Sequence, residues 1–235
     1  MLPRLRHYTS SFLRANSDRI STLRHYQQQI RTMRIPYVPN PPQPASDEEA
    51  AIVERIQARR APRPLQPLDL ALLHSPPVAD GWNSFLGAVR TRTSLAADLR
   101  EIAVSRVAVV NRAWYEWMHH APLAEQAGVS KTGMNEVVRR ETPLELLSSS
   151  ESGAPVPVPV PEGLTEKQWL VVCYTDEMTR NVQVKDETFA RLKEVFTERE
   201  IVEITATVAC YNCVSRFLVA LDVGEKNGVG PDAAH

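Results

Sequence analysis

Clustered prolines divide this sequence into helix-length pieces and leave little room for a sheet. Residues 33–44, 62–67 and 148–163 together hold twelve of the 18 prolines. Because proline has no N–H and cannot continue a helix, each cluster predicts extended or irregular chain. The segments between the clusters carry apolar residues at helical spacing. We therefore expect an all-α fold, with the Val-rich but proline-interrupted stretch 156–160 forming no strand.

Capping motifs indicate where the helices between these prolines begin. Ser46 with Glu49 and Thr197 with Glu200 form capping boxes, and Ser94 and Thr165 are expected to cap the helices that follow them. The helices expected from these caps and from the apolar spacing cover, in chain order, residues 46–56, 68–73, 82–89, 95–128, 130–138, 165–178, 187–196 and 201–223. The intervening residues 74–77 are expected to form a rigid loop.

Two of the expected helices share short sequence matches. Glu101-Ile102 recurs as Glu203-Ile204, and Val107-Ala108-x-x-Asn111 recurs as Val208-Ala209-x-x-Asn212. The two matches lie 102 and 101 residues apart, so their spacing agrees within one residue. This agreement predicts a duplicated helical unit.

Composition excludes several classes of protein. A chain of 235 residues can form one large domain or two small ones, and its net charge of -1 argues against a dedicated nucleic-acid binder. No uninterrupted apolar run approaches the roughly 18 residues of a membrane helix, so we expect no membrane span. Three cysteines do not make a disulfide framework and favour a reducing compartment. No cofactor motif is present, and we expect neither a cofactor nor a metal.

The N-terminal segment differs in charge from the rest of the chain. Residues 1–34 contain seven arginines, no lysine and one acid, a net charge of +6. An arginine-rich, acid-poor start is typical of a mitochondrial presequence, and a solvated basic extension is the alternative. We expect a basic extension at 1–32, a helical domain at 33–223 containing the proline-rich linker 148–163, and a flexible tail at 224–235. The expected compartment is the cytoplasm or the mitochondrial matrix.

The expected helix at 95–128 carries the strongest candidate for chemistry. Glu116 and His120 are four residues apart and share one helical face. A carboxylate beside an imidazole raises its pKa and fixes its tautomer, and such a pair can transfer protons at neutral pH. The candidate substrate-binding residues around the pair are Trp114, Tyr115, Trp117, His119 and Trp82. The alternative is an ordinary surface pair beside aromatic core residues.

A second candidate is the Cys210-Tyr-Asn-Cys213 motif. Two thiols within one helical turn can form a disulfide or react with an oxidant. However, Phe217 stands where a following histidine would be needed, and the apolar neighbours raise a thiol pKa. Burial of these cysteines as small apolar residues is the favoured interpretation. Because Cys173 is the only other cysteine, we expect no metal site here.

The helical segment and its flanks resemble the carboxymuconolactone decarboxylase and alkylhydroperoxidase D-like family, especially its larger, fungal-type members. The residues that carry the resemblance are Leu72 to Pro76, Trp82, Ser94-Leu95, Arg100-Glu101, Arg106-Val107-Ala108, Tyr115-Glu116-Trp117 with His120, Ala124, Gly128, Tyr174 to Thr179, and Tyr211-Asn212 with Ser215-Arg216. The resemblance extends over about residues 33–223. It implies an all-α bundle around a helical hairpin, assembled as a dimer, trimer or hexamer with sites near subunit contacts.

The resemblance also implies roles for individual residues. The peroxidase branch of that family has a Cys-x-x-Cys pair, a histidine four residues later and a glutamate twelve residues before. Glu101 and His120 match the glutamate and the histidine, whereas Ala113 and Glu116 occupy the two thiol positions. Thiol chemistry is therefore not expected at this position, and Glu101, Glu116 and His120 remain as an acid–base set.

The separation of these residues predicts a break in the helix. Glu101 and His120 are 19 residues apart, which is roughly 28 Å along one straight helix. They can act together if the helix breaks near residues 111–113, as the two consecutive helices of the resembling family imply.

The function expected from these residues is small-molecule acid–base catalysis. The resemblance implies decarboxylation or a related lyase step on a cyclic, carboxylated substrate. Glu116 would abstract or relay a proton, His120 would protonate the carbanion and Glu101 would orient His120. The alternatives are a peroxidase-type redox protein that uses Cys210 and Cys213, and a non-catalytic oligomeric binding protein.

Overall fold

Helices make up most of the regular structure in residues 32–149 and 155–232, the part of the chain that the computed structural model describes. The helices are α2 (Asp47–Arg60), α3 (Pro67–Leu72), α4 (Pro76–Thr91), α5 (Ala97–Val110), α6 (Trp114–Gln126), α7 (Lys131–Gly133), α8 (Glu166–Asn181), α9 (Asp186–Val195) and α10 (Glu198–Leu221), with a π-helical turn at Met134–Val138 and a 3₁₀ turn at Val223–Glu225. The predicted all-α fold is confirmed. The predicted basic extension lies, apart from its last residue, outside the described residues.

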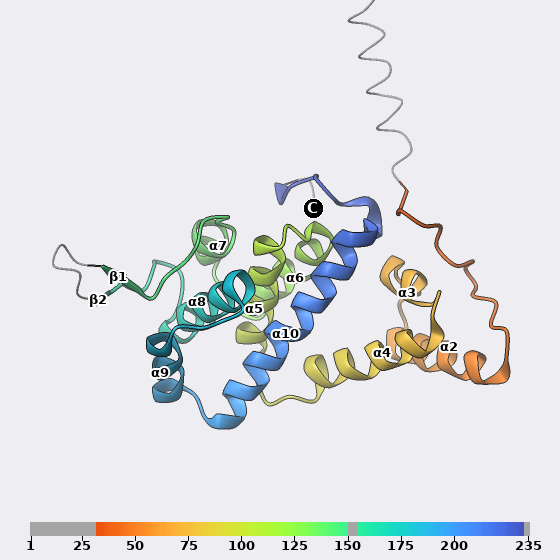
Figure 1. The fold of residues 1–235 in the computed structure, drawn as a ribbon, viewed down its shortest axis with the longest axis horizontal. Coiled ribbons are helices and arrows are strands. Elements are labelled where there is room, and N and C mark those ends of the chain that lie inside the picture. Colours follow the sequence, from red (N-terminus) through yellow and green to blue (C-terminus); the bar gives the residue numbers. More distant parts are fainter. Residues whose placement is uncertain (1–31, 150–154, 233–235) are drawn as a thin grey trace, which may run out of the picture.

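Helix α5 lies at the centre of the bundle. Each of its residues from Ile102 to Val109 is buried, as expected for a helix that is enclosed on all sides. It packs against α6, α8 and α10. Helices α2 to α4 lie on one side of this centre, and α7 to α9 lie on the other (Figure 1).

The predicted break in the long helix is confirmed. Helix α5 ends at Val110 and α6 begins at Trp114, so the expected segment 95–128 forms two helices that pack against each other. Arg112 turns the chain with a left-handed φ of 53°. The second helix therefore returns along the first, and residues far apart in sequence meet across the hairpin.

The two helices with matching sequence motifs, α5 and α10, pack together. Asn111 and Asn212, the last residues of the matched segments, are joined by a hydrogen bond of 3.1 Å from Nδ2 of Asn111 to Oδ1 of Asn212. The duplicated residues thus face each other at one end of the helix pair.

Three local expectations are corrected. Residues 76–77 begin helix α4 rather than a loop, because the fixed φ of proline suits the first helical turn. Ser94 does not cap α5; its amide and hydroxyl both donate to Oε2 of Glu203, at 2.9 and 2.8 Å. The proline-rich linker contains a short antiparallel pair of strands, β1 (Leu147–Ser149) and β2 (Pro155–Pro157). A two-stranded ribbon tolerates prolines because each strand has an edge that needs no N–H donor.

The start of the predicted flexible tail is held by the segment that precedes α2. The Gly224 amide donates to the Tyr37 hydroxyl at 2.8 Å, and the Tyr37 hydroxyl donates to Glu225 at 3.1 Å. The Met33 amide also donates to Glu225, at 3.0 Å. Both ends of the described chain are therefore fixed beside α10, whereas residues 233–235 lie outside the description.

Helix α10 has 24 residues and a mean hydropathy of 1.5 over its most apolar window. By length and composition alone it could cross a membrane, although we expected no span from the sequence. In the fold it buries Ile204, Val208 and Leu218 and packs against α4, α5, α6, α8 and α9. A core helix of a bundle meets the same criterion of length and apolarity.

Candidate active site

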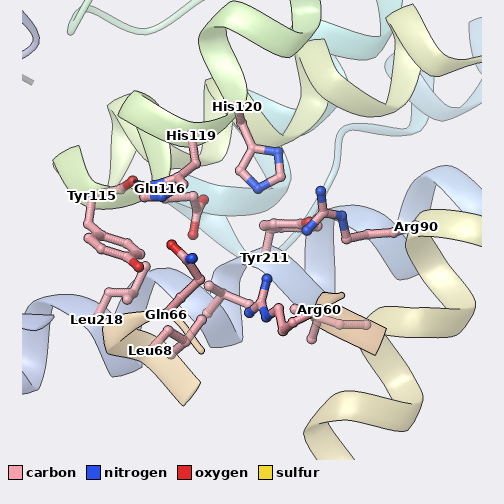
Figure 2. Close-up of a pocket in the computed structure, with 12 residues that line it drawn as sticks. Arg60, Gln66, Leu68, Arg90, Tyr115, Glu116, His119, His120, Tyr211 and Leu218 are labelled. Atoms are coloured by element: carbon pink, nitrogen blue, oxygen red, sulfur yellow. Dashed lines mark hydrogen bonds between the residues drawn. The ribbon is translucent and has the colours of Figure 1, made fainter. Parts of the chain in front are cut away.

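Helix α6 presents two different faces. Tyr115, Glu116, His119 and His120 are spaced one helical turn apart in two neighbouring rows, and all four line one cavity. The cavity has a volume of about 60 Å³, enough for a few atoms of a ligand or a few waters. Its other walls come from α3, α4 and α10 and from Arg60 at the end of α2 (Figure 2).

The tryptophans of α6 lie on its opposite face. Trp114 and Trp117 are three residues apart and are buried among the apolar core. Trp82 of α4 packs against Phe217 of α10, with ring centroids 5.2 Å apart. None of the three is among the residues that line the His120 cavity. The three tryptophans therefore do not line this cavity, whereas Tyr115 and His119 do, and substrate binding by any of them stays a prediction.

The break between α5 and α6 brings Glu101 to His120. Oε2 of Glu101 lies 2.6 Å from Nδ1 of His120, and both side chains are buried. Arg100 donates from Nε to the other oxygen of Glu101, at 3.1 Å. Glu101 therefore orients the imidazole, the role expected from the sequence.

The charge state of this pair follows from burial and from its hydrogen bond. Burial lowers the pKa of His120, although the hydrogen bond and charge of Glu101 oppose this change. Burial raises the pKa of Glu101, but the hydrogen bond and charge of His120, together with Arg100, bring it below its usual value. At neutral pH the arrangement is a neutral imidazole whose Nδ1–H donates to a carboxylate. This tautomer leaves Nε2 as a proton acceptor.

The Nε2 edge of the His120 ring points into the cavity, between Glu116 and Tyr211 (Figure 2). Glu116 forms its hydrogen bonds elsewhere: the Ser215 hydroxyl of α10 lies 3.0 and 3.1 Å from its two carboxyl oxygens. The expectation that Glu116 and His120 share one pocket agrees with the structure, but their hydrogen-bond partners are Ser215 and Glu101 rather than each other.

Burial raises the pKa of Glu116 well above its usual value, and the Ser215 hydrogen bond opposes this only in part. Glu116 is thus placed to hold a proton where an ordinary carboxyl has lost it. The pKa of Glu116 is raised and that of His120, one helical turn away, is lowered. This difference favours a protonated carboxyl beside a neutral imidazole, one group able to give a proton and the other able to accept one. These directions favour the reverse of the roles expected from the sequence, with His120 as the proton acceptor and Glu116 as the proton donor.

Tyr211 of α10 completes the cavity wall. Its ring meets the His120 ring edge to face, with centroids 4.9 Å apart and an interplanar angle of 80°. The side chain is 1% exposed and extends toward the Arg90 guanidinium (Figure 2). No residue of the described chain forms a hydrogen bond with its hydroxyl, so that hydroxyl is free to bind a ligand. Burial raises the pKa of Tyr211, which keeps it a donor.

Neither Cys210 nor Cys213 is among the residues that line the His120 cavity. Both are free; Cys210 is buried and Cys213 is exposed. Burial raises the pKa of Cys210 to about 12, so its reactive thiolate is scarce at neutral pH. Among residues 32–149 and 155–232, no three His, Cys, Asp or Glu side chains are grouped to hold a metal ion.

Sequence analysis missed several residues of the site. Ser215 and Tyr211 were quoted only as parts of a family pattern, and Arg60 and Arg90 were not singled out. A serine or an arginine in a helix has no local signature that predicts which distant side chain it contacts. A signal was available only for the arginines, because Arg59-Arg60-x-x-Arg63 is a dense basic run at the end of α2.

Comparison with known proteins agrees with the helical fold. Residues 76–151, which include Glu101, Glu116 and His120, match the model of the carboxymuconolactone decarboxylase family. The chain is similar in structure to an uncharacterized peroxidase-related protein from Silicibacter sp. TM1040, with a TM-score of 0.58 and 17% sequence identity, over 85% of this chain and 98% of that one. A search of curated proteins found no match.

Proposed function

We propose that the chain is an acid–base enzyme acting on a small molecule in the His120 cavity, since residues 76–151 match the model of the carboxymuconolactone decarboxylase family. The finer proposal is decarboxylation, or a related lyase step, on a cyclic substrate that carries a carboxylate. Its substrate class comes from the family, and its residue roles come from the geometry.

One observation carries this proposal. Nδ1 of His120 forms a hydrogen bond with Oε2 of Glu101, 2.6 Å away. Nε2 of His120 faces the cavity, which the buried Glu116 also lines. The pKa of His120 is lowered and that of Glu116 is raised. A neutral base and a protonated acid on one cavity wall are the two groups that proton transfer in both directions requires.

For decarboxylation, the steps balance with these two groups. The substrate carboxylate is already ionised at neutral pH, and the bond from it to the ring breaks to release carbon dioxide. The electron pair passes into the conjugated carbonyl of the ring, and Glu116 gives its proton to the ring carbon. One proton from solvent, accepted at Nε2 of His120 and passed on, then restores the protonated Glu116.

The cavity also contains donors for an anionic intermediate. Arg60 and Arg90 line it beside the free Tyr211 hydroxyl. Charged and neutral donors already in place stabilise negative charge as it develops, and such groups contribute strongly when water is excluded. These groups support a carboxylated substrate over a neutral one.

The peroxidase alternative lacks support at this cavity. The two positions that would carry thiols hold Ala113 and Glu116, and burial raises the pKa of Cys210 to about 12. The word peroxidase in the name of the structural neighbour describes that protein. Thiol chemistry at Cys210 and Cys213 is the alternative that the following experiment can detect.

The test compares four variants with the unaltered chain on a panel of cyclic carboxylated lactones, with carbon dioxide release as the readout. His120→Gln and Glu116→Gln should each lower kcat/KM by about 10²–10⁴-fold, the usual contribution of a positioned acid or base. Cys210→Ser and Cys213→Ser should leave it unchanged. Thiol-dependent peroxide consumption that needs the cysteines but not His120 would contradict the proposal.

A further inference from the structure

A second, larger pocket lies next to the His120 cavity. Its volume is about 390 Å³, and it shares Arg60 and Arg90 with the cavity. Glu101 also lines it, while its partner His120 lines the cavity, so the hydrogen-bonded pair separates the two spaces. A ligand held in this pocket lies beside Glu101, the hydrogen-bond partner of the proposed base.

Arginines dominate the lining of this pocket. Five of its residues are arginines from three helices or their ends: Arg59, Arg60, Arg63, Arg90 and Arg100. We name this set the arginine basin. Within the described part of the chain, two carboxylates pair with the set: Glu101 pairs with Arg100, and Asp69 pairs with Arg60 at 2.7 Å and with Arg59 at 3.9 Å. Five positive charges against two negative ones leave an excess of three.

Several guanidinium groups in the basin have unused hydrogen-bonding capacity. The guanidinium groups of Arg90 and Arg63 form no hydrogen bond or ion pair with any residue of the described chain, and the buried Nε of Arg60 has no partner. The Tyr211 hydroxyl, buried and free, lies toward Arg90 (Figure 2). Leaving a buried donor unsatisfied costs free energy, and a bound oxyanion removes that cost.

The mutual repulsion of the arginines points the same way. Burial, and next the charge of Arg60, lower the pKa of Arg59, and Arg90 adds to this effect. Several like charges brought together at a half-buried pocket are stabilised by an anion placed between them.

We propose that the arginine basin binds an oxyanionic group of charge −2 or more, either a phosphate or a cluster of carboxylates, which anchors the substrate beside the Glu101–His120 pair. This proposal rests on the proposed function for the identity of the reacting cavity, but not for the binding itself. Three of its arginines, Arg59, Arg60 and Arg63, precede the matched family segment, which begins at residue 76, whereas Arg90 and Arg100 lie inside that segment.

The test is calorimetric titration of the whole chain with three probes: citrate, pyrophosphate and acetate. Citrate or pyrophosphate should bind measurably and more weakly at higher salt, because the attraction is between charges, whereas the monoanion acetate should bind far less. Tighter binding of citrate assigns the basin to carboxylates, and tighter binding of pyrophosphate assigns it to a phosphate.

Arg90→Gln combined with Arg63→Gln should weaken binding by at least tenfold. Neither side chain forms a hydrogen bond within the described chain, so the variant should fold, and circular dichroism checks that it does. Arg191→Gln, an exposed arginine of α9 whose side chain is 48% accessible, serves as the control and should bind normally. Absence of binding by both polyanions, or equal weakening in the control, would overturn the proposal.

His120→Gln separates this proposal from the proposed function. If the basin is an anchor, this variant keeps its affinity for the probe even though it loses turnover. Retained turnover with normal binding would refute the catalytic role and leave the basin in place. Normal turnover by the unaltered chain, without binding of either polyanion, would refute the arginine basin as an anion site and leave the catalytic role of His120 in place.

Discussion

Glu116 and His120 illustrate how one helix can hold two groups with opposite proton preferences. Both are buried, but burial favours the neutral form of each, which is protonated for a carboxyl and deprotonated for an imidazole. Glu101 keeps its charge beside His120 because Arg100 and the imidazole both donate to it. The separation of acid and base thus follows from the chemical type of each residue in the same dry environment.

The raised pKa of Glu116 predicts a pH-dependent cost to stability. An unfolded glutamate loses its proton near pH 4.5, whereas the folded one keeps it to higher pH. The free energy of unfolding is therefore not reduced by Glu116 below about pH 4.5. It falls as pH rises from there toward the pKa of Glu116 in the folded chain. Glu116→Gln, which keeps a donor and an acceptor near Ser215, should gain free energy of unfolding relative to the unaltered chain between pH 4.5 and pH 8.

Urea unfolding of both proteins at several pH values measures that gain. The difference between the two should grow with pH and then level off. A difference that stays constant from pH 4.5 to pH 8 would mean that Glu116 titrates normally in the folded chain. Glu48→Gln, an exposed change in the first turn of α2, is a control for the loss of a surface charge.

The turn after α10 couples the C-terminal segment to the cavity. Gly224 has a φ of +71°, and a Cβ added there would lie 2.3 Å from the ring of Tyr115. Tyr115 lines the His120 cavity. The glycine therefore permits a close approach that fixes a wall of the proposed active site.

Gly224→Ala should lower the free energy of unfolding by about 1–3 kcal/mol, the usual cost of overpacking a well-packed site, and should also weaken ligand binding because Tyr115 must move. Gly230→Ala is the matched control: its φ is +85°, but a Cβ there would meet nothing within 4 Å. Thermal unfolding of both variants separates the clash from backbone strain. Equal losses would show that the contact with Tyr115 contributes nothing.

The hairpin of α5 and α6 shows what could be predicted from the sequence. Helix caps and apolar spacing predicted the helices. The separation of Glu101 and His120 along the chain predicted the break that brings these two residues together. The partners of Glu116 and the arginine basin were not predicted, because they depend on how α2, α4 and α10 pack on the hairpin. Local periodicity identifies which face of a helix is buried but does not identify the helix that covers it. For the same reason the sequence did not predict that Trp114 and Trp117 lie among the apolar core rather than around His120.

Arg106 connects distant parts of the whole bundle. It is fully buried in α5, and its guanidinium donates to Asp176 of α8 and to the backbone carbonyls of Val138, Arg140 and Thr142. The Asp176 carboxylate also accepts from Arg180 at 2.9 Å and from the Leu144 amide at 3.1 Å. One side chain thus fixes the chain between α7 and α8 onto the central helix.

Arg106→Met should destabilise the fold by about 3–5 kcal/mol, because it leaves a buried carboxylate and several carbonyls without their donor. Arg112→Met is the control: it removes an exposed pair with Glu141, whose side chains are 72% and 51% accessible, and such pairs contribute about 0–1 kcal/mol. Urea unfolding measures both. Similar losses in the two variants would contradict the structural role given to Arg106.

Self-association and the cellular compartment remain predictions from the sequence.

The state of the His120 ring tests the central claim most directly. Nitrogen NMR of the chain with ¹⁵N-labelled histidine, assigned by comparison with His120→Gln, reports the protonation of each ring nitrogen. We expect a neutral ring at pH 7 with the proton on Nδ1, held by Glu101, and a titration below the usual value of about 6.5. A doubly protonated ring at pH 7, or a proton on Nε2 instead of Nδ1, would contradict the assignment of His120 as the base.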